Sequence, residues 1–352
     1  MRATIMRRGQ FTVENLADPQ PAAGEVLVRT LACGICGSDL HAFKHPEAIL
    51  RPADIEHGIV MGHEYCAEIV DYGPGTARKL KPGTRVCAMP LLTRPDGIEI
   101  VGYSVGYPGG FGEYMRLPET LLLPVPNGLA TERAAMTEPM AVGLHAVQRA
   151  NAARDDAPLV IGCGPVGLAV IIALKLKGIG PVVAADFSPR RRELAKAVGA
   201  DIVIDPKDVS PFTSWHDAAA VKDPARAQRL SPWTPFPARR PALIFECVGV
   251  PGMIESVMAA APPQARIVVV GLCMENDHFL PVTGIMKELN LQFVLGYNGE
   301  EFAASLNNIA EGKINPEPLI TGKVGVAGIA QAFQDLVSPE KHAKILVEPG
   351  RK

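Results

Sequence analysis

The spacing of apolar positions divides the chain into three parts. Residues 1–145 contain short runs in which apolar and polar residues alternate, separated by Gly and Pro, for example EVLVRTLAC, CAEIVDYG and GTRVCAMP. A period of two is typical of strands that bury one face, and closely spaced turns between such strands are typical of barrels. We therefore predict a partly open β-barrel for this part.

Residues 146–294 alternate between uninterrupted apolar runs and helical patterns. Runs such as PLVIGCG, PVVAADF and ARIVVVGL flank helical segments such as GLAVIIALKLKG and PRRRELAKAVGA. This alternation is typical of a parallel sheet covered by helices on both faces, which predicts a doubly wound α/β domain. The remaining residues, 295–352, are expected to return to the first domain.

Residues 206–241 interrupt the α/β pattern. They are rich in proline and hold both tryptophans, Trp215 and Trp233, where a compact domain needs only a short connection. They follow the strand DIVID, whose carboxyl end lies near the adenosine side of a dinucleotide site. We predict that they cover that side or pack against another subunit, and a loosely ordered surface loop is the alternative.

Composition excludes several functional classes. The net charge of −2 gives no basic excess that would suggest nucleic acid as a partner. The seven cysteines are odd in number and scattered, unlike the dense framework of a small secreted protein, so a reducing cytoplasm is expected. The N-terminus has no apolar block of signal-peptide length, which argues against export.

The uncharged stretch from Ala157 to Leu174 reaches the lower length limit of a membrane span. Three glycines and a proline, Gly162, Gly164, Pro165 and Gly167, divide it into an apolar strand, a tight turn and a helix. A buried β-turn-α unit explains the same apolarity, so no membrane segment is expected.

The turn GCGPVG has the spacing of a dinucleotide-binding site. Gly162 allows the tight turn, Gly164 lets the backbone approach a pyrophosphate, and Gly167 permits close helix packing. Asp186 ends the next strand, where a carboxylate would bind the adenosine ribose and repel a 2′-phosphate. NAD is therefore preferred over NADP, although Arg191 and its neighbours lie close enough to weaken that preference.

The stretch LACGICGSDLH, residues 31–41, places Cys33 and Cys36 three apart. A redox pair normally begins a helix in a thioredoxin-like βαβ pattern, whereas these cysteines follow a strand of the barrel region. A closed structural zinc site normally needs a second close pair of ligands, and the chain has no second Cys-x-x-Cys. An open catalytic zinc site needs only three ligands, which Cys36 with His63 and Glu64 of the GHE motif could begin to supply.

Several motifs occur in a fixed order along nearly the whole chain: GICGSDLH, GHE, KPGTRV, EPMAVGLHAV, GCGPVG and IFECVG. In this combination the sequence resembles the medium-chain, zinc-dependent alcohol and polyol dehydrogenases, in their branch similar to sorbitol and threonine dehydrogenases. The resemblance implies a GroES-like catalytic domain interrupted by a Rossmann domain. Many relatives also carry a lobe with four close cysteines that bind a structural zinc. The corresponding stretch here retains only Cys87, so that second zinc is not expected.

The resemblance also implies the metal ligands. Cys36 and His63 match the family's ligands. Glu138 of the EPM motif occupies the third-ligand position that polyol-type members fill with a carboxylate, with Glu64 as its alternating neighbour. Asp39 is a candidate to orient the ring of His63.

The proton relay and the cofactor contacts follow from the same resemblance. Ser38 would take the substrate hydroxyl proton, and His41 would pass it toward solvent. Lys344 matches a basic position that faces the cofactor phosphates, with a solvated surface lysine as the alternative. Cys33 has no role in the matched pattern and is predicted to be buried. The residues expected to contact the cofactor are Gly162, Gly164, Pro165, Val166, Gly167, Asp186, Arg191, Val248, Gly271, Leu272 and Lys344.

These observations predict a cytoplasmic, NAD-dependent enzyme that oxidises an alcohol or polyol reversibly, with one catalytic zinc per chain, as a homodimer or homotetramer. Two other classes stay open. One is a nucleotide-binding sensor or scaffold that kept the fold without the metal chemistry, and the other is a zincless quinone or enoyl reductase. Nothing in the sequence identifies the alcohol.

Overall fold

The computed structural model describes residues 1–94, 97–126, 128–223, 225, 227 and 238–351. The chain divides into two compact units, of which the first combines Met1–Pro139 with Gly299–Lys352 and the second is Met140–Asn298. The first boundary thus falls at residue 139, against 145 expected from the sequence, and the second at 298, against 294.

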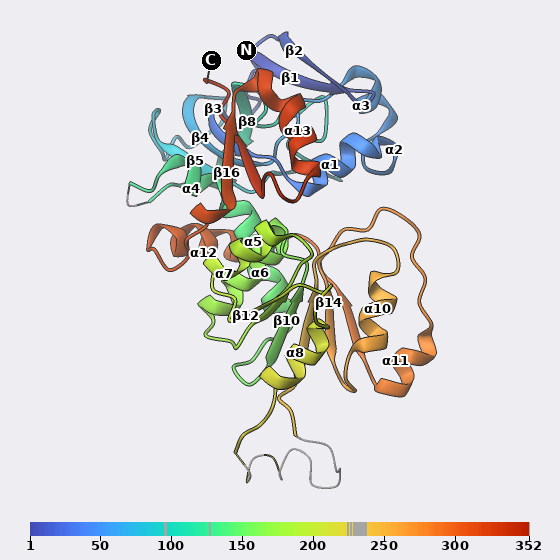
Figure 1. Cartoon of the computed structure of the whole chain (residues 1–352). Helices are drawn as coiled ribbons and strands as arrows, with labels where there is room; N and C mark the ends of the chain where they lie inside the picture. The colour runs from blue at the N-terminus through green and yellow to red at the C-terminus, as the bar shows by residue number, and fades with distance from the viewer. Residues whose placement is uncertain (95–96, 127, 224, 226, 228–237, 352) are drawn as a thin grey trace. The chain divides into compact units, whose positions relative to one another are not determined.

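The first unit is built on a seven-stranded sheet in the order β16-β17-β3-β4-β5-β9, with β8 paired to β3 (Figure 1). The β3 strand is long and alternates between apolar and polar residues, so one of its faces packs into the barrel core. The strands are β3 (Glu25–Gly34), β4 (Glu64–Tyr72), β5 (Arg85–Ala88), β8 (Tyr114–Pro118), β9 (Leu122–Pro124), β16 (Ile320–Val324) and β17 (Lys344–Val347).

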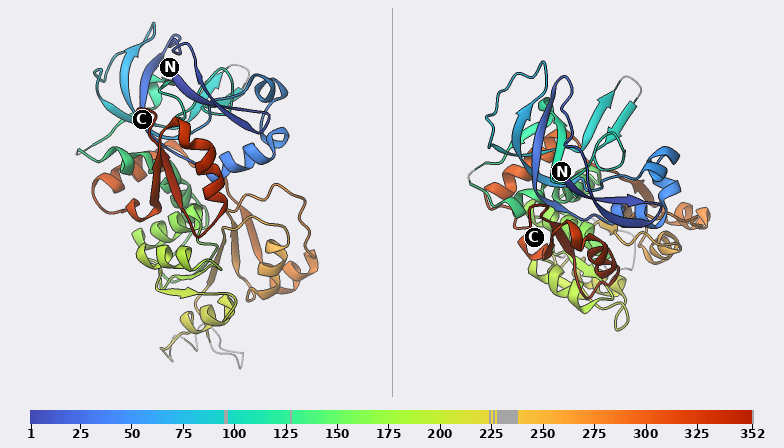
Figure 2. Two further views of the ribbon diagram at one scale, coloured as in Figure 1. Left: turned by 45° about the horizontal axis from the view of Figure 1, so that its top comes forward. Right: turned by 90° about the horizontal axis from the view of Figure 1, so that it is seen from above.

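The C-terminal segment belongs to this sheet, because β17 pairs antiparallel with β3 through Leu346↔Gly34 and Val347↔Cys33. Figure 2 shows these last strands in red beside the blue first strands. Two hairpins complete the β structure: β1 (Arg2–Arg7) with β2 (Gln10–Asn15), and β6 (Leu91–Arg94) with β7 (Gly97–Ile100). The helices of the unit are α1 (Gly37–Lys44), α2 (Pro46–Ile49), α3 (Pro52–His57), α4 (Thr131–Ala135), α12 (Gly299–Ala310) and α13 (Ile329–Val337), with 3-10 turns at Glu119–Leu121, Glu317–Leu319 and Val326–Gly328.

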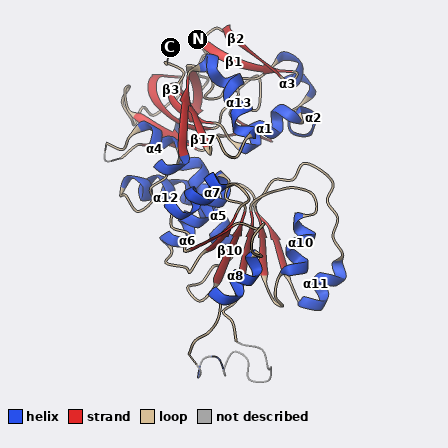
Figure 3. Cartoon of the chain, in the orientation of Figure 1, coloured by secondary structure: helices blue, strands red, loops and turns tan. Residues whose placement is uncertain are grey.

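The second unit is a six-stranded parallel sheet in the order β12-β11-β10-β13-β14-β15. Numbered within the unit this order is 3-2-1-4-5-6, the Rossmann arrangement, and helices cover both faces, with α6 and α7 on one side and α10 and α11 on the other (Figure 3). The strands are β10 (Ala157–Ile161), β11 (Val183–Ala185), β12 (Ile202–Ile204), β13 (Ala242–Glu246), β14 (Arg266–Val269) and β15 (Asn290–Phe293). The helices are α5 (Thr137–Arg149, whose first three residues belong to the first unit), α6 (Pro165–Leu176), α7 (Pro189–Ala197), α8 (Pro211–Ala218), α10 (Met253–Ala260) and α11 (Pro281–Lys287). The predicted combination of a barrel-like domain and a doubly wound α/β domain is confirmed.

The prediction that residues 206–241 cover the adenosine side of a cofactor is wrong for their described part from residue 211 onward. Residues 211–218 form α8, and Trp215 is buried in the core of the second unit, where its Nε1 donates to the Ala157 carbonyl at 2.7 Å. Arg240, at the other end of the segment, donates to the carbonyls of Asp155 at 3.1 Å and Gly180 at 2.7 Å. These anchors lie where β10 and β13 begin, whereas cofactors bind beyond the carboxyl ends of such strands. Trp233 lies outside the described residues.

Among the described residues no helix combines the length and apolarity that crossing a bilayer requires. The uncharged stretch 157–174 instead forms β10, the glycine turn and most of α6, as the sequence predicts.

Candidate metal and proton-transfer centre

Three potential metal ligands converge in the first unit. Cys36 follows the end of β3 and is the N-cap of α1, whereas His63 and Glu64 stand at the start of β4. The antiparallel pairing Gly34↔Glu64 brings these two chain segments together. The Cys36 Sγ, a His63 ring nitrogen and a Glu64 carboxylate oxygen all lie within 4.8 Å of one another. Sulfur, imidazole nitrogen and carboxylate oxygen together suit a zinc ion.

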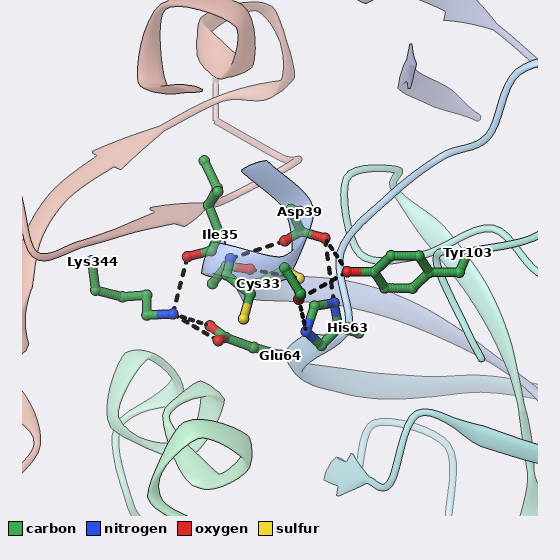
Figure 4. A network of polar contacts seen from close by, with 10 residues as sticks. Cys33, Ile35, Asp39, His63, Glu64, Tyr103 and Lys344 are labelled. Atoms are coloured by element: carbon green, nitrogen blue, oxygen red, sulfur yellow. Dashed lines mark hydrogen bonds and ion pairs between the residues drawn. The ribbon is translucent and has the colours of Figure 1, made fainter. Parts of the chain in front are cut away.

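Asp39 links the two segments that carry these ligands (Figure 4). Its side chain is fully buried, and its Oδ2 accepts the backbone N–H of Cys36 at 2.9 Å. Its Oδ1 lies 3.4 Å from His63 Nδ1. That geometry is too poor for a hydrogen bond, and Nδ1 has no other partner among the residues that the structure describes, so the contact is mainly electrostatic. Asp39 therefore lies where the sequence placed the residue that orients the ring of His63.

The charges around His63 favour its protonated form. Burial by itself would lower the pKa of this imidazole, but the Asp39 carboxylate and the Cys36 side chain outweigh it and raise the pKa well above 6.5. A metal ion at this site must therefore displace a proton from His63, so its binding weakens as the pH falls.

The position of Lys344 contradicts the sequence-based prediction. Its ammonium was expected to face cofactor phosphates, but it is buried inside the first unit, where it lies 2.6 and 2.7 Å from the two Glu64 oxygens and donates to the Ile35 carbonyl at 3.0 Å. Burial alone would lower the pKa of Lys344, but the attraction of Glu64 raises it above 10.5. Gly34 makes room for this pair, because a Cβ there would lie 2.0 Å from Glu64 Oε2.

Glu138 differs from its expected place among the ligands. It is buried in the first turn of α5, but it is not part of the group formed by Cys36, His63 and Glu64. Its negative charge is close enough to raise the pKa of Lys344. The carboxylate that the fold brings to the sulfur and imidazole is thus Glu64.

The two relay candidates lie one turn apart on α1. Ser38 Oγ is 3.5 Å from His63 Nε2 and 2.9 Å from the hydroxyl of Tyr103. His41 is half-buried, and its burial, followed by the positive charges of His45 and Lys44, lowers its pKa below 6.5. The lowered pKa favours the neutral ring of His41, which can accept a proton.

Tyr103 belongs to none of the motifs and was missed by the sequence analysis. Its segment, GYSVGYPGG, gave no signal beyond turn-forming glycines. Only the folded chain brings it to Ser38 and Asp39, more than 60 positions away. Cys33, in contrast, is fully buried in the core of the first unit, as predicted.

The dinucleotide turn in the second unit has the geometry that its glycines predict. Gly162 has a φ of +91°, and a Cβ on Gly167 would lie only 1.9 Å from the Gly162 carbonyl oxygen. Gly164 is the N-cap of α6, and Pro165 is that helix's first residue, followed by Val166. The helix N-terminus with its free N–H groups is a ready site for a pyrophosphate.

Asp186 faces this turn from the end of β11. Its Oδ2 accepts the backbone N–H of Cys163 at 2.8 Å, and its Oδ1 accepts that of Ser188 at 2.8 Å. The nearest guanidinium nitrogen of Arg191 is 3.9 Å from Oδ2. The carboxylate and the cation that bear on the choice between NAD and NADP thus lie side by side.

The remaining cofactor candidates gather at the carboxyl ends of β13 and β14. The Val248 side chain approaches Gly162, because a Cβ on that glycine would lie 2.8 Å from Val248 Cγ2. Gly271 packs against the backbone of Gly249, and Leu272 follows it with a partly exposed side chain. The predicted set, apart from Lys344, therefore surrounds one edge of the parallel sheet.

Comparisons with known proteins agree with this architecture. Residues 22–127 match the alcohol dehydrogenase GroES-like domain, and residues 165–311 match the zinc-binding dehydrogenase domain. The chain is 30% identical to (R,R)-butanediol dehydrogenase of Bacillus subtilis over 96% of both proteins, and 28% identical to sorbitol dehydrogenase of Gallus gallus over 95% of this chain and 92% of that one.

Solved structures extend the likeness to the whole fold. The crystal structure of 2R,3R-butanediol dehydrogenase from Bacillus subtilis has a TM-score of 0.81 at 28% identity and covers 99% of both chains. Galactitol-1-phosphate dehydrogenase from Escherichia coli has a TM-score of 0.79 at 26% identity, covering 99% of this chain and all of that one. The chain therefore belongs to the zinc-dependent medium-chain alcohol and polyol dehydrogenases, which are nicotinamide-dependent oxidoreductases.

Proposed function

We propose that Cys36, His63 and Glu64 hold the catalytic zinc of this alcohol or polyol dehydrogenase. The observation that carries this proposal is the convergence of their three ligand atoms within 4.8 Å. Lys344 does not prevent Glu64 from binding a metal, because a carboxylate has about four lone-pair sites and the ammonium occupies only part of them. Three protein ligands leave a fourth position for the substrate. A metal-free sensor or a zincless reductase would have no need of these three converging groups.

The reaction is shared between the bound groups and the chain's own residues. A bound zinc ion acts as a Lewis acid toward the substrate oxygen, and the nicotinamide is the hydride carrier. Ser38 accepts the hydroxyl proton of the alcohol as it gives up its own proton. His41, whose lowered pKa favours the neutral ring, is the acceptor that releases this proton to solvent. Asp39 keeps the His63 ring oriented throughout.

The metal assignment is tested by elemental analysis of protein purified without added zinc. One zinc per chain is expected in the unaltered enzyme and in Glu138→Gln, with a strong loss of zinc in Glu64→Gln. Chelation should abolish turnover and leave the circular dichroism spectrum largely unchanged, because both units have their own cores. Two zincs per chain, or full activity without metal, would contradict the proposal.

We also propose that NAD is preferred over NADP. The support is the carboxylate of Asp186 at the turn, which would accept hydrogen bonds from a ribose and repel a 2′-phosphate. Arg191 lies beside it and could accommodate that phosphate. The proposal is that the Asp186 carboxylate outweighs Arg191 in the choice between NAD and NADP. NAD should give the higher kcat/KM, and Asp186→Gly should narrow the difference. Better use of NADP by the unaltered enzyme would exclude this preference.

The substrate is proposed to be a small alcohol or polyol of the kind named for the relatives. Initial rates of NADH formation should be measured with butanediol stereoisomers, sorbitol and simple primary and secondary alcohols. Activity with none of these, but with quinones or enoyl compounds, would favour the zincless reductase class.

We propose a homo-oligomer on the basis of the second unit. The β15 strand pairs only with β14 within the described chain, and large apolar side chains are exposed around it, namely Ile285, Met286, Phe293 and Leu295. Such an edge and patch favour pairing with another chain. Sedimentation velocity should give a dimer or tetramer, and Phe293→Lys should reduce it to monomers; a monomeric unaltered protein would refute the proposal.

All seven cysteines are free thiols in the structure. Since Cys36 can bind a metal only as a thiolate, a reducing compartment suits the enzyme, and we propose the cytoplasm. Cell fractionation tests this assignment.

A further inference from the structure

Tyr103 is held in place by the same backbone that presents His63. Its loop lies against residues 60–62, where Gly110 N–H donates to the Gly62 carbonyl at 2.8 Å. The neighbouring Gly102, at a φ of +87°, packs so closely that a Cβ there would lie 2.9 Å from the Gly62 nitrogen. The side chain of Tyr103 is thus fixed relative to the start of β4.

The hydroxyl of Tyr103 contacts two groups of the proposed centre (Figure 4). It lies 2.9 Å from Ser38 Oγ and 3.2 Å from Asp39 Oδ1, and its ring centroid is 5.4 Å from that of His63. We propose that Tyr103 is a positioning residue that holds the Ser38 hydroxyl in the orientation needed for proton transfer. This inference rests on the relay role proposed above for Ser38.

The numbers of donors and acceptors support this role. Asp39 can only accept, and its Oδ2 is already bound to the Cys36 N–H, so Oδ1 faces the tyrosine as a second acceptor. Ser38 Oγ has one proton and two lone pairs. The single phenol proton is shared between Asp39 Oδ1 and one lone pair of Ser38 Oγ, so the other lone pair of the serine stays open for the substrate proton, and the serine's own proton points to the next acceptor. The phenol keeps its proton throughout the transfer.

Without Tyr103, Ser38 would have little to fix its side chain. Its other contact is the 3.5 Å approach to His63 Nε2, which is long for a hydrogen bond and uses the nitrogen that a metal would occupy. A phenylalanine at position 103 would fill the same space but leave the Ser38 hydroxyl free to rotate. We expect a loss of about tenfold in kcat, the size of one lost hydrogen bond.

The experiment compares Tyr103→Phe, Ser38→Ala and the double variant with a matched control, Tyr107→Phe. Tyr107 lies in the same loop and is also a phenol bound to a carboxylate, Glu25 Oε1 at 3.1 Å, although it is buried and Tyr103 only partly so. Tyr103→Phe should lower kcat with KM within about twofold, increase the solvent isotope effect on kcat, and keep one zinc per chain. The double variant should be no slower than Ser38→Ala, because both changes act on one step. Tyr107→Phe should keep the unaltered kcat.

Each other outcome has a definite meaning. If Ser38→Ala keeps full activity, the relay itself fails, and the role of Tyr103 fails with it. If Ser38→Ala is slow but Tyr103→Phe is not, or if the two losses multiply in the double variant, the relay stands and the Tyr103 assignment is overturned. Loss of zinc from Tyr103→Phe, seen by elemental analysis without any activity assay, would show that it acts through Asp39 and the metal ligands, which also overturns it.

Discussion

The dinucleotide turn occupies six consecutive residues, Gly162 to Gly167, whereas the proposed metal centre and its polar neighbours come from segments around residues 36–39, 63–64, 103 and 344. The turn depends on its backbone conformation and on the absence of a Cβ atom at its three glycines. In the centre, strand pairing must bring buried groups of opposite charge together, so that each neutralises the other. The turn therefore has local requirements, and the centre depends on contacts across the whole first unit.

The largest expected effect separates catalysis from folding in the metal centre. Cys36→Ala removes a thiolate ligand, so kcat should fall by about 1,000-fold or more, since the metal is worth several kcal/mol in the transition state. Circular dichroism should stay close to that of the unaltered protein. Cys33→Ala is the control, because this buried thiol three residues earlier is not one of the three groups that could hold the metal and should keep zinc and activity. If Cys36→Ala kept its zinc and its turnover, Cys36 would not be a ligand of the catalytic metal.

Lys344→Met tests how far the centre depends on a neutralised charge. The substitution leaves the Glu64 carboxylate buried without a cation, which should cost about 3–5 kcal/mol in the free energy of unfolding. The control is Lys323→Met on the neighbouring strand, whose ion pairs with Glu132 and Glu348 are partly exposed and worth at most about 1 kcal/mol. Urea unfolding measures both, and similar losses would show that the buried pair has no special weight. Because the pKa of Lys344 is raised, the ion pair contributes fully to stability at neutral pH. This contribution is lost only as the pH rises above the pKa of an ordinary lysine and through the raised pKa of Lys344.

Gly167→Ala tests the local packing of the turn. Its Cβ would stand 1.9 Å from the Gly162 carbonyl oxygen, a backbone atom that cannot move aside alone. We expect a loss of about 3 kcal/mol in stability together with weaker NAD binding, measured by thermal unfolding and by cofactor fluorescence titration. An unchanged melting temperature would show that the turn is more adaptable than the structure indicates.

Gly164→Ala should have the smallest effect on folding and so sharpens the contrast within one turn. The nearest atoms to its Cβ belong to the Arg191 guanidinium at 3.9 Å, and the backbone conformation is one that alanine adopts. Stability should change by less than about 0.5 kcal/mol, while NAD binding weakens by about tenfold, because the methyl group occupies the approach to the pyrophosphate. If stability and affinity fall together, this glycine serves the fold and not the cofactor.

The sequence by itself determined the features that short stretches encode. Apolar periodicity gave both domain types, the spacing of Gly162, Gly164 and Gly167 gave the turn, and the order of motifs indicated Cys36 and His63. These features depend on neighbouring residues, whose allowed backbone angles and burial periods are properties of the local chain.

Only the tertiary structure decided how distant residues share a charge or a proton. The pairing Gly34↔Glu64 brings Glu64, and not Glu138, into the group with Cys36 and His63, and Lys344 reaches Glu64 across 280 positions of sequence. The same holds for Tyr103 and for the burial of Trp215. Strand register and loop packing bring these residues together, and a buried charge or hydroxyl takes whichever partner the fold supplies, which no local pattern encodes.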